Sequence, residues 1–207
     1  HYEAHNLRAI EACRNGELGI LRTVASEHGF QAAKGTWRLN KKLAGGGALW
    51  DIGIYGVNAA RYLTGQDPIE VTAFGNRLPG DARFDEVDDL THMVLRFPKD
   101  PKNGSPLASI STGYSWRGAN NYRVVGTSGT LLAEPATPYE GHRLTVNGKD
   151  PGVTPNDQFS AMLDHMAESV ATGAKTTRTP GEMGLVDIRI LQAALDSARD
   201  GRPKSLK

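Results

Sequence analysis

Residues 45–65, GGGALWDIGIYGVNAARYLTG, contain the side chains whose types and spacing best suit chemistry. Asp51 and Tyr55 are one helical turn apart, and at about 100° per residue Asn58 and Tyr62 continue the same line along a helix. A phenol in such a line can transfer a proton in catalysis when a neighbouring cation stabilises its charged form. The alternative is that Asp51 and Tyr55 only satisfy neighbouring backbone groups, and the spacing alone favours neither interpretation.

Apolar residues flank this polar line on both sides, unlike the single apolar stripe of an ordinary surface helix. Such a pattern predicts a helix in the interior whose polar line faces a cleft. Three glycines precede the helix and let the backbone pass close to a ligand or to another segment. The flanking residues are Leu49, Ile52, Ala59 and Leu63 on one side and Trp50, Ile54 and Val57 on the other.

The pattern of the whole chain predicts one α+β domain spanning residues 1–207. Helical spacing of apolar residues predicts helices at 3–15, 157–172 and 182–200, in addition to the glycine-rich helix. Because short loops join most of the extended segments, we expect a large, mainly antiparallel, open-faced sheet with helices on one face. Strands are predicted at 20–31, 69–77, 88–97, 107–116, 120–127, 130–135 and 143–147.

The second face of this sheet has no predicted helix to cover it. The segment LASISTGYSW, residues 107–116, carries tryptophan, tyrosine and isoleucine, which are rarely exposed together on a broad face. We therefore expect this face to meet another chain or domain, and to form a homo-oligomer.

Composition and charge narrow the class of partner. Hydrophobic residues make up 39% and charged residues 23% of the chain, as in ordinary globular domains. The formal net charge of +1 gives no field that would attract nucleic acid or an anionic membrane, so we expect a small-molecule partner. No signal peptide or membrane-crossing apolar run is visible. The single Cys13 fits a reducing compartment, so we expect the cytoplasm, and the periplasm stays open because the chain starts at His1.

The sequence does not predict a metal site. His1 and His5 have the i, i+4 spacing of a metal-binding pair, but no third ligand is indicated. Ordinary histidines of a terminal helix are the simpler interpretation.

The segment at 45–65 resembles the signature of the Gfo/Idh/MocA oxidoreductases, the family of glucose-fructose oxidoreductase, in the branch with tyrosine four residues after the aspartate. Other segments resemble the same family, in the same order, along nearly the whole chain. These are HYEAHNLRAIEACRNGELG at the start, the Trp37-Arg38 pair, GTSGTLLAEPA at 126–136 and GEMGLVDIRILQAALDSARDGRP near the end.

The resemblance implies a protein of two domains, of which this chain is the second. In the family, an N-terminal Rossmann domain binds NAD(P), and a C-terminal domain contains the large open sheet. The dinucleotide fingerprint must follow a strand and open a helix, whereas the glycines here follow a polar loop. The family's Glu-Lys-Pro motif, whose lysine takes part in catalysis, would also precede His1. We therefore expect the N-terminal NAD(P)-binding domain to be missing from this chain.

The resemblance also implies roles for single residues. Tyr55 matches the proton-transfer group beside the nicotinamide and the reacting carbon of the sugar, and Asp51 matches a residue that orients substrate. Trp37 and Arg38 resemble residues near the cofactor and substrate, although a cap or a salt bridge in a loop explains Arg38 nearly as well. Asn58 and Tyr62 are expected to line the substrate pocket.

Two functions are open at this point. The chain is either the C-terminal part of an NAD(P)-dependent oxidoreductase acting on a sugar, polyol or related substrate, and inactive by itself, or a non-catalytic dimerisation or binding module on the same scaffold. The sequence identifies neither the sugar nor the choice between NAD and NADP, because the missing domain reads the ribose of the cofactor.

Overall fold

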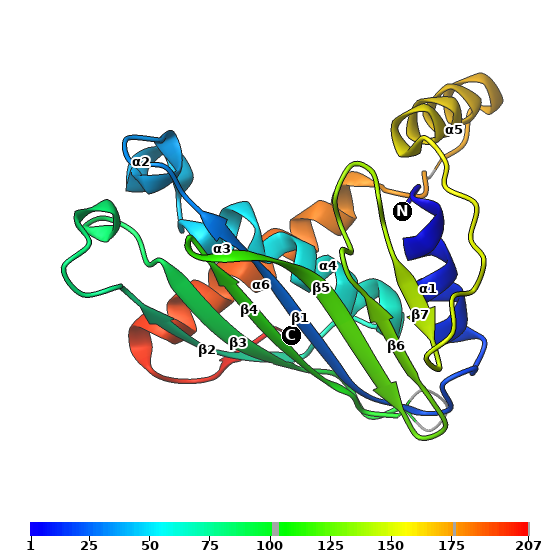
Figure 1. Ribbon diagram of the computed structural model, residues 1–207, viewed down its shortest axis with the longest axis horizontal. Helices are drawn as coiled ribbons and strands as arrows, with labels where there is room; N and C mark the ends of the chain where they lie inside the picture. Colours follow the sequence, from blue (N-terminus) through cyan, green and yellow to red (C-terminus); the bar gives the residue numbers. More distant parts are fainter. Residues whose placement is uncertain (101–103, 176, 207) are drawn as a thin grey trace.

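The computed structural model describes residues 1–100, 104–175 and 177–206 (Figure 1). These residues form an eight-stranded sheet in the order β7-β6-β5-β1-β4-β3-β2-β8. Neighbouring strands are antiparallel except for β1 and β4, which run parallel. The strands are β1 (Leu21–Gln31), β2 (Glu70–Asn76), β3 (Leu90–Arg96), β4 (Leu107–Gly113), β5 (Ser115–Gly126), β6 (Thr130–Ala133), β7 (Leu144–Val146) and β8 (Lys204–Ser205).

Three helices cover one face of the sheet, and the core lies between the two layers (Figure 1). They are α1 (Ala4–Arg14), α4 (Gly53–Thr64) and α6 (Gly181–Asp200). The predicted α+β class, with a large and mainly antiparallel open sheet, is therefore confirmed. The shorter helices are α2 (Lys41–Ala44), α3 (Ala48–Asp51) and the 3₁₀ turns η1 (Trp37–Leu39) and η2 (Ala82–Phe84).

The parallel pairing of β1 with β4 is the part of the topology that the sequence did not predict. The chain leaves β1, passes through α4, β2 and β3, and then places β4 beside β1, with Thr23 opposite Leu107. β5 returns antiparallel on the other side of β1. As a result β1 lies inside the sheet, and its alternate residues Val24, Ser26 and His28 face the helices and are buried.

The composition expected for the open face was wrong. Ile110 and Tyr114 are buried on the helical side, because the alternation of β4 and the turn after it places them in the core. The open side of the central strands carries mostly small or polar residues such as Ser109 and Ser111. Its exposed apolar side chains lie on four different strands: Phe74 on β2, Val94 on β3, Leu107 on β4 and Leu132 on β6.

Helix α5 (Gln158–Thr172) projects beyond the edge of the sheet, next to the N-terminus (Figure 1). The predicted apolar side of this helix exists, but it packs on no core, and its residues are between 41% and 70% exposed. They are Phe159, Met162, Leu163, Met166 and Val170. No helix among the described residues is long and apolar enough to cross a membrane.

The glycine-rich segment forms two helices, and not the single helix that was predicted. α3 ends at Ile52, whose φ of −123° and ψ of −16° break the helical geometry before α4 begins. The hydroxyl of Thr112 on β4 donates to the carbonyl of Ala48 at 3.1 Å and ties α3 to the sheet. α4 ends with Gly65 in the left-handed conformation, as expected.

Helix α4 lies very close to the sheet at Gly56. A Cβ atom added there would lie 2.5 Å from Cγ2 of Ile110, a buried β-branched side chain that has little freedom to move. At Gly53, one turn earlier, an added Cβ would meet Cδ1 of Leu49 at 3.2 Å and Cγ2 of Thr112 at 3.4 Å, so the packing there is less tight than at Gly56. Glycine at these positions lets the helix backbone rest directly on β4.

We expect the substitution Gly56→Ala to lower the free energy of unfolding by about 1–3 kcal/mol, because the added methyl must displace α4 or Ile110. Gly184→Ala is the matched control, since this glycine is also helical and nothing lies within 4 Å of its added Cβ. The control should leave stability unchanged or raise it by up to about 1 kcal/mol. Urea unfolding measures both changes, and equal stability of the two variants would contradict the close packing.

His28 predicts a pH dependence of stability. Burial lowers the pKa of its imidazole from 6.5 to about 4, so the unfolded chain binds a proton that the folded chain excludes. The contribution of neutral His28 to the free energy of unfolding is therefore fully present above pH 6.5. It is lost as the pH falls toward 4, and the total loss is about 3 kcal/mol. In His28→Gln this contribution disappears, so urea unfolding should show a flatter pH profile for the variant. Parallel profiles would contradict the assignment.

Candidate functional site

A cleft of about 290 Å³ runs along one side of α4. Tyr55, Asn58 and Tyr62 line it, so three of the four residues in the predicted polar line meet at one cavity. Asp51 lies beyond the break at Ile52, on α3, and does not line this cleft. The interruption of the helix thus separates Asp51 from the residues with which it was expected to form a continuous line.

Tyr55 is 45% exposed, which is high for a tyrosine on a helix that packs on the core. The ring of His28 on β1 stacks beside it, with centroids 5.4 Å apart and planes at 30°. Nδ1 of His28 lies 3.1 Å from Oγ of Ser26, and its low pKa keeps the ring neutral. His28 was not predicted as a site residue, because only the folded sheet brings it to Tyr55.

Asp51 is held by two donors. Nε of Arg38 donates to Oδ2 of Asp51 at 2.7 Å, and the hydroxyl of Tyr114 donates to the same oxygen at 2.8 Å. The hydrogen bond with Asp51 is the main reason that the pKa of Arg38 is raised, and the charge of Tyr55 also contributes. Burial and the bond to Asp51 raise the pKa of Tyr114, which therefore stays protonated and donates.

The Trp37-Arg38 pair lies in η1, where the predicted loop is found. The guanidinium carbon of Arg38 is 4.7 Å from the ring centroid of Trp37 and 5.8 Å from that of Phe30, so the cation lies within range of both aromatic rings. Trp37 is half exposed. The salt-bridge interpretation of Arg38 thus describes its geometry, and a contact with a cofactor stays a prediction.

The side chain of Asn58 is held by a hydrogen bond to α6. Its Nδ2 donates to Oδ2 of Asp187 on α6 at 2.5 Å, and Nη1 of Arg61 donates to Oδ1 of the same carboxylate at 2.5 Å. Arg61 also forms an ion pair with Asp67 at 2.7 Å. Tyr62 is the next cleft residue, and burial raises its pKa to about 12, so its hydroxyl is protonated at neutral pH.

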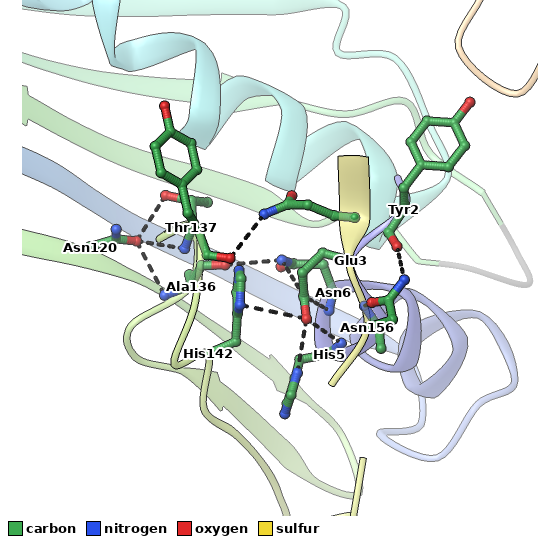
Figure 2. A network of polar contacts seen from close by, with 12 residues as sticks. Tyr2, Glu3, His5, Asn6, Asn120, Ala136, Thr137, His142 and Asn156 are labelled. Atoms are coloured by element: carbon green, nitrogen blue, oxygen red, sulfur yellow. Dashed lines mark hydrogen bonds and ion pairs between the residues drawn. The ribbon is translucent and has the colours of Figure 1, made fainter. Parts of the chain in front are cut away.

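The opposite wall of the cleft is polar and comes from segments far apart in the chain. Glu3 and Asn6 at the start of α1, Tyr122 on β5 and His142 before β7 all line it. The hydroxyl of Tyr122 donates to Oδ1 of Asn6 at 2.6 Å. These residues were not predicted as site residues, because no motif connects them and the pairing of α1 with the 136–142 segment is a tertiary contact (Figure 2).

His1 and His5 do not act as a pair. The ring of His1 contacts that of Tyr62, with centroids 3.7 Å apart, whereas His5 turns toward Glu3 and His142. The i, i+4 spacing therefore did not identify the side chains that meet.

The arrangement suits a small molecule that carries several hydroxyl groups. The cleft offers phenol, amide, carboxylate and imidazole groups within one cavity, and a cleft of this volume is at the lower end of the range for small-molecule sites. Tyr55 is the exposed ionisable group on the helical wall. Such a site can bind by hydrogen bonds and exchange a proton with a bound hydroxyl.

Comparisons with known proteins identify relatives of this chain. A family model described as GFO/IDH/MocA C-terminal domain matches residues 6–132. D-xylose 1-dehydrogenase (NADP(+)) 2 of Haloferax volcanii is 30% identical over 97% of this chain and 61% of its own length. The NADP(+) D-xylose 1-dehydrogenase of Haloarcula marismortui is 29% identical over 78% of this chain and 44% of its own. The chain therefore spans about half the length of these relatives.

A solved structure shows the same fold. The crystal structure of aldose-aldose oxidoreductase from Caulobacter crescentus, complexed with glycerol, has a TM-score of 0.89 and 41% identity to this chain. The match covers 99% of this chain and 61% of that one. The family model covers well over half of the chain, and the relatives agree with it, so this chain belongs to the Gfo/Idh/MocA oxidoreductase family, whose C-terminal domain it contains.

Proposed function

We propose that this chain is the substrate-binding and catalytic part of an NAD(P)-dependent oxidoreductase that moves hydride between nicotinamide and a sugar or polyol. The observation that carries the proposal is Tyr55, a half-exposed phenol on the wall of a polar cleft. The printed names of the relatives, which include D-xylose dehydrogenases and an aldose-aldose oxidoreductase, support the substrate class.

Tyr55 is the proton-transfer group in this proposal. When a hydroxyl carbon is oxidised, its C–H bond breaks and hydride leaves, while the O–H proton passes to the phenolic oxygen of Tyr55. In the reverse direction Tyr55 returns the proton to the carbonyl oxygen. The neutral ring of His28 supports the Tyr55 ring and adds no charge that would compete for the proton.

Asn58 and Tyr62 position the substrate within the cleft, and Asp51, which does not line the cleft, orients a part of the substrate that extends beyond it. Asp51 is pre-oriented by Arg38 and Tyr114, both of which bond to Oδ2. No described residue hydrogen-bonds to its Oδ1, which leaves that oxygen to accept a substrate hydroxyl. Asn58 is fixed by Asp187, so the polar line keeps its geometry when no substrate is present.

The cofactor is held mainly by residues outside the described chain in this proposal. Within the described ranges, the parallel strands β1 and β4 are connected through two antiparallel strands, and not by the direct strand–helix–strand turn that binds a dinucleotide. Trp37 and Arg38 offer an exposed indole and a cation that fit contacts with an aromatic ring and an anionic group. When bound, nicotinamide accepts or supplies the hydride.

We also propose that an N-terminal NAD(P)-binding domain contacts α5. The apolar side of α5 is uncovered and lies next to the N-terminus of the chain (Figure 1). Exposed apolar surface of this kind marks an interaction site. The relatives are longer than this chain by enough to include such a domain.

The substitution Tyr55→Phe tests the proton-transfer role in the whole protein. Hydride transfer should slow by roughly 10²–10⁴, because the ring keeps its packing but loses the group that moves the proton. Single-turnover nicotinamide absorbance under saturating substrate is the measurement. Tyr139→Phe is the matched control, since this tyrosine lines the same cleft and is largely exposed, and its rate should stay within a few-fold. A Tyr55→Phe rate equal to wild type, with hydride transfer limiting, would refute the proposal.

We further propose that the open sheet face forms a homo-oligomer. Val94 is exposed on this face between the small side chains of Thr72 and Ser109 on the neighbouring strands, where a second copy can approach. Sedimentation equilibrium at micromolar concentration should show association in wild type and a shift toward monomer in Val94→Lys, which places a charge in the contact. Leu78→Lys, at an exposed apolar residue in the loop after β2, should behave as wild type. A monomeric wild type would overturn this prediction.

A further inference from the structure

Glu3, His5 and His142 form a cluster that the proposed proton transfer does not use. Glu3 and His5 lie at the start of α1, and His142 reaches them from the segment before β7 (Figure 2). One ligand atom from each side chain lies within 4.8 Å of the other two. The three side chains are 5%, 14% and 7% exposed, so the cluster is largely shielded from solvent.

The carboxylate of Glu3 is fixed in place by its role at the helix terminus. Its Oε1 accepts the backbone N–H of His5 at 2.9 Å, and its Oε2 accepts the backbone and side-chain N–H groups of Asn6 at 2.7 and 2.8 Å. The other end of the Asn6 amide is bonded to Tyr122. These bonds hold the carboxylate ionised and rigid, with Oε1 directed at the two imidazoles.

Both histidines present Nδ1 to the same oxygen. Nδ1 of His5 lies 2.9 Å from Oε1 of Glu3, and Nδ1 of His142 lies 3.6 Å from it. The imidazole rings are nearly parallel, at 15°, with centroids 5.9 Å apart. Nδ1 of His5 is at hydrogen-bond distance from Oε1, whereas Nδ1 of His142 is at ion-pair distance.

The spacing matches that of ligands around one small ion. In a tetrahedral site with bonds of about 2.0–2.1 Å, ligand atoms are separated by about 3.3 Å. The two separations between Glu3 and the imidazoles, 2.9 and 3.6 Å, lie on either side of this value, and all three ligand atoms lie within 4.8 Å of one another. Two imidazoles with one carboxylate favour zinc and similar transition metals over magnesium or calcium, which prefer oxygen ligands.

We propose that Glu3, His5 and His142 bind one divalent transition-metal ion of the zinc class, with an open coordination position toward the cleft. Glu3 and His142 line the same cavity as Tyr55, so a small molecule in the cleft can reach the ion. Three protein ligands with one open position are the pattern of zinc sites that contact a ligand. The sequence indicated no third ligand beside His1 and His5, because His142 is 137 positions from His5 in the chain.

Zinc titration of the metal-stripped protein tests the site. Calorimetry should show one equivalent of Zn²⁺ bound, whereas Mg²⁺ should not bind. His5→Gln and His142→Gln each remove one ligand and should weaken Zn²⁺ binding by at least about 100-fold. His92→Gln is the matched control, because His92 lies exposed on the open sheet face beside Ser111, and its affinity should equal that of wild type.

Two further readouts separate lost ligation from lost folding. Zn²⁺ should raise the melting temperature of wild type and His92→Gln but not that of His142→Gln. In long-range ¹H–¹⁵N spectra, Zn²⁺ should shift Nδ1 of His5 and His142 and leave the His92 ring unchanged. An absence of Zn²⁺ binding in wild type would overturn the site, and so would equal binding by folded His142→Gln. Either result would mean that the imidazoles only surround the helix-capping carboxylate.

Discussion

The contact of α4 with the sheet at Gly56 constrains the rest of the candidate site. The helix backbone packs on Ile110, because a Cβ atom added at Gly56 would lie 2.5 Å from a buried methyl of that residue. Neither the distance of α4 from the sheet nor its rotation about its own axis can therefore change freely. With that side of the helix fixed, the side that carries Tyr55 and Asn58 must point toward the cleft. Close packing in the core thereby sets the position of a group proposed to transfer a proton, through a residue that never contacts substrate.

Charged groups hold Asn58 and Asp51, which lie toward the two ends of the predicted polar line. Arg61 and Asp187 form a nearly buried ion pair that joins α4 to α6 and holds Asn58, while Arg38 holds Asp51 at the other end. Removing charges from water offsets much of their mutual attraction, so such pairs contribute more to geometry than to net stability. Their rigidity is what a site needs if it is to bind a flexible hydroxylated molecule without first reorganising.

The sequence predicted the local structure well and the tertiary contacts poorly. Alternation and helical spacing located the strands and the main helices, because these patterns reflect burial of neighbouring residues. The ordered motifs also identified the family. The break at Ile52 was not predicted, because no local pattern marks it and the groups that bond to α3, Thr112 and Tyr114, lie far away in the chain. The approach of His142 to Glu3 was not predicted either, because no local pattern encodes a contact across that much of the chain.

The most direct measurement is a crystal structure of the whole protein with a nicotinamide cofactor and an aldose or polyol bound. The account predicts a substrate hydroxyl within hydrogen-bond distance of the phenolic oxygen of Tyr55, with the rest of the molecule in the cleft between α4 and the start of α1. A substrate that binds elsewhere, with the hydroxyl of Tyr55 bonded only to protein groups, would contradict the central claim that this cleft is the catalytic site.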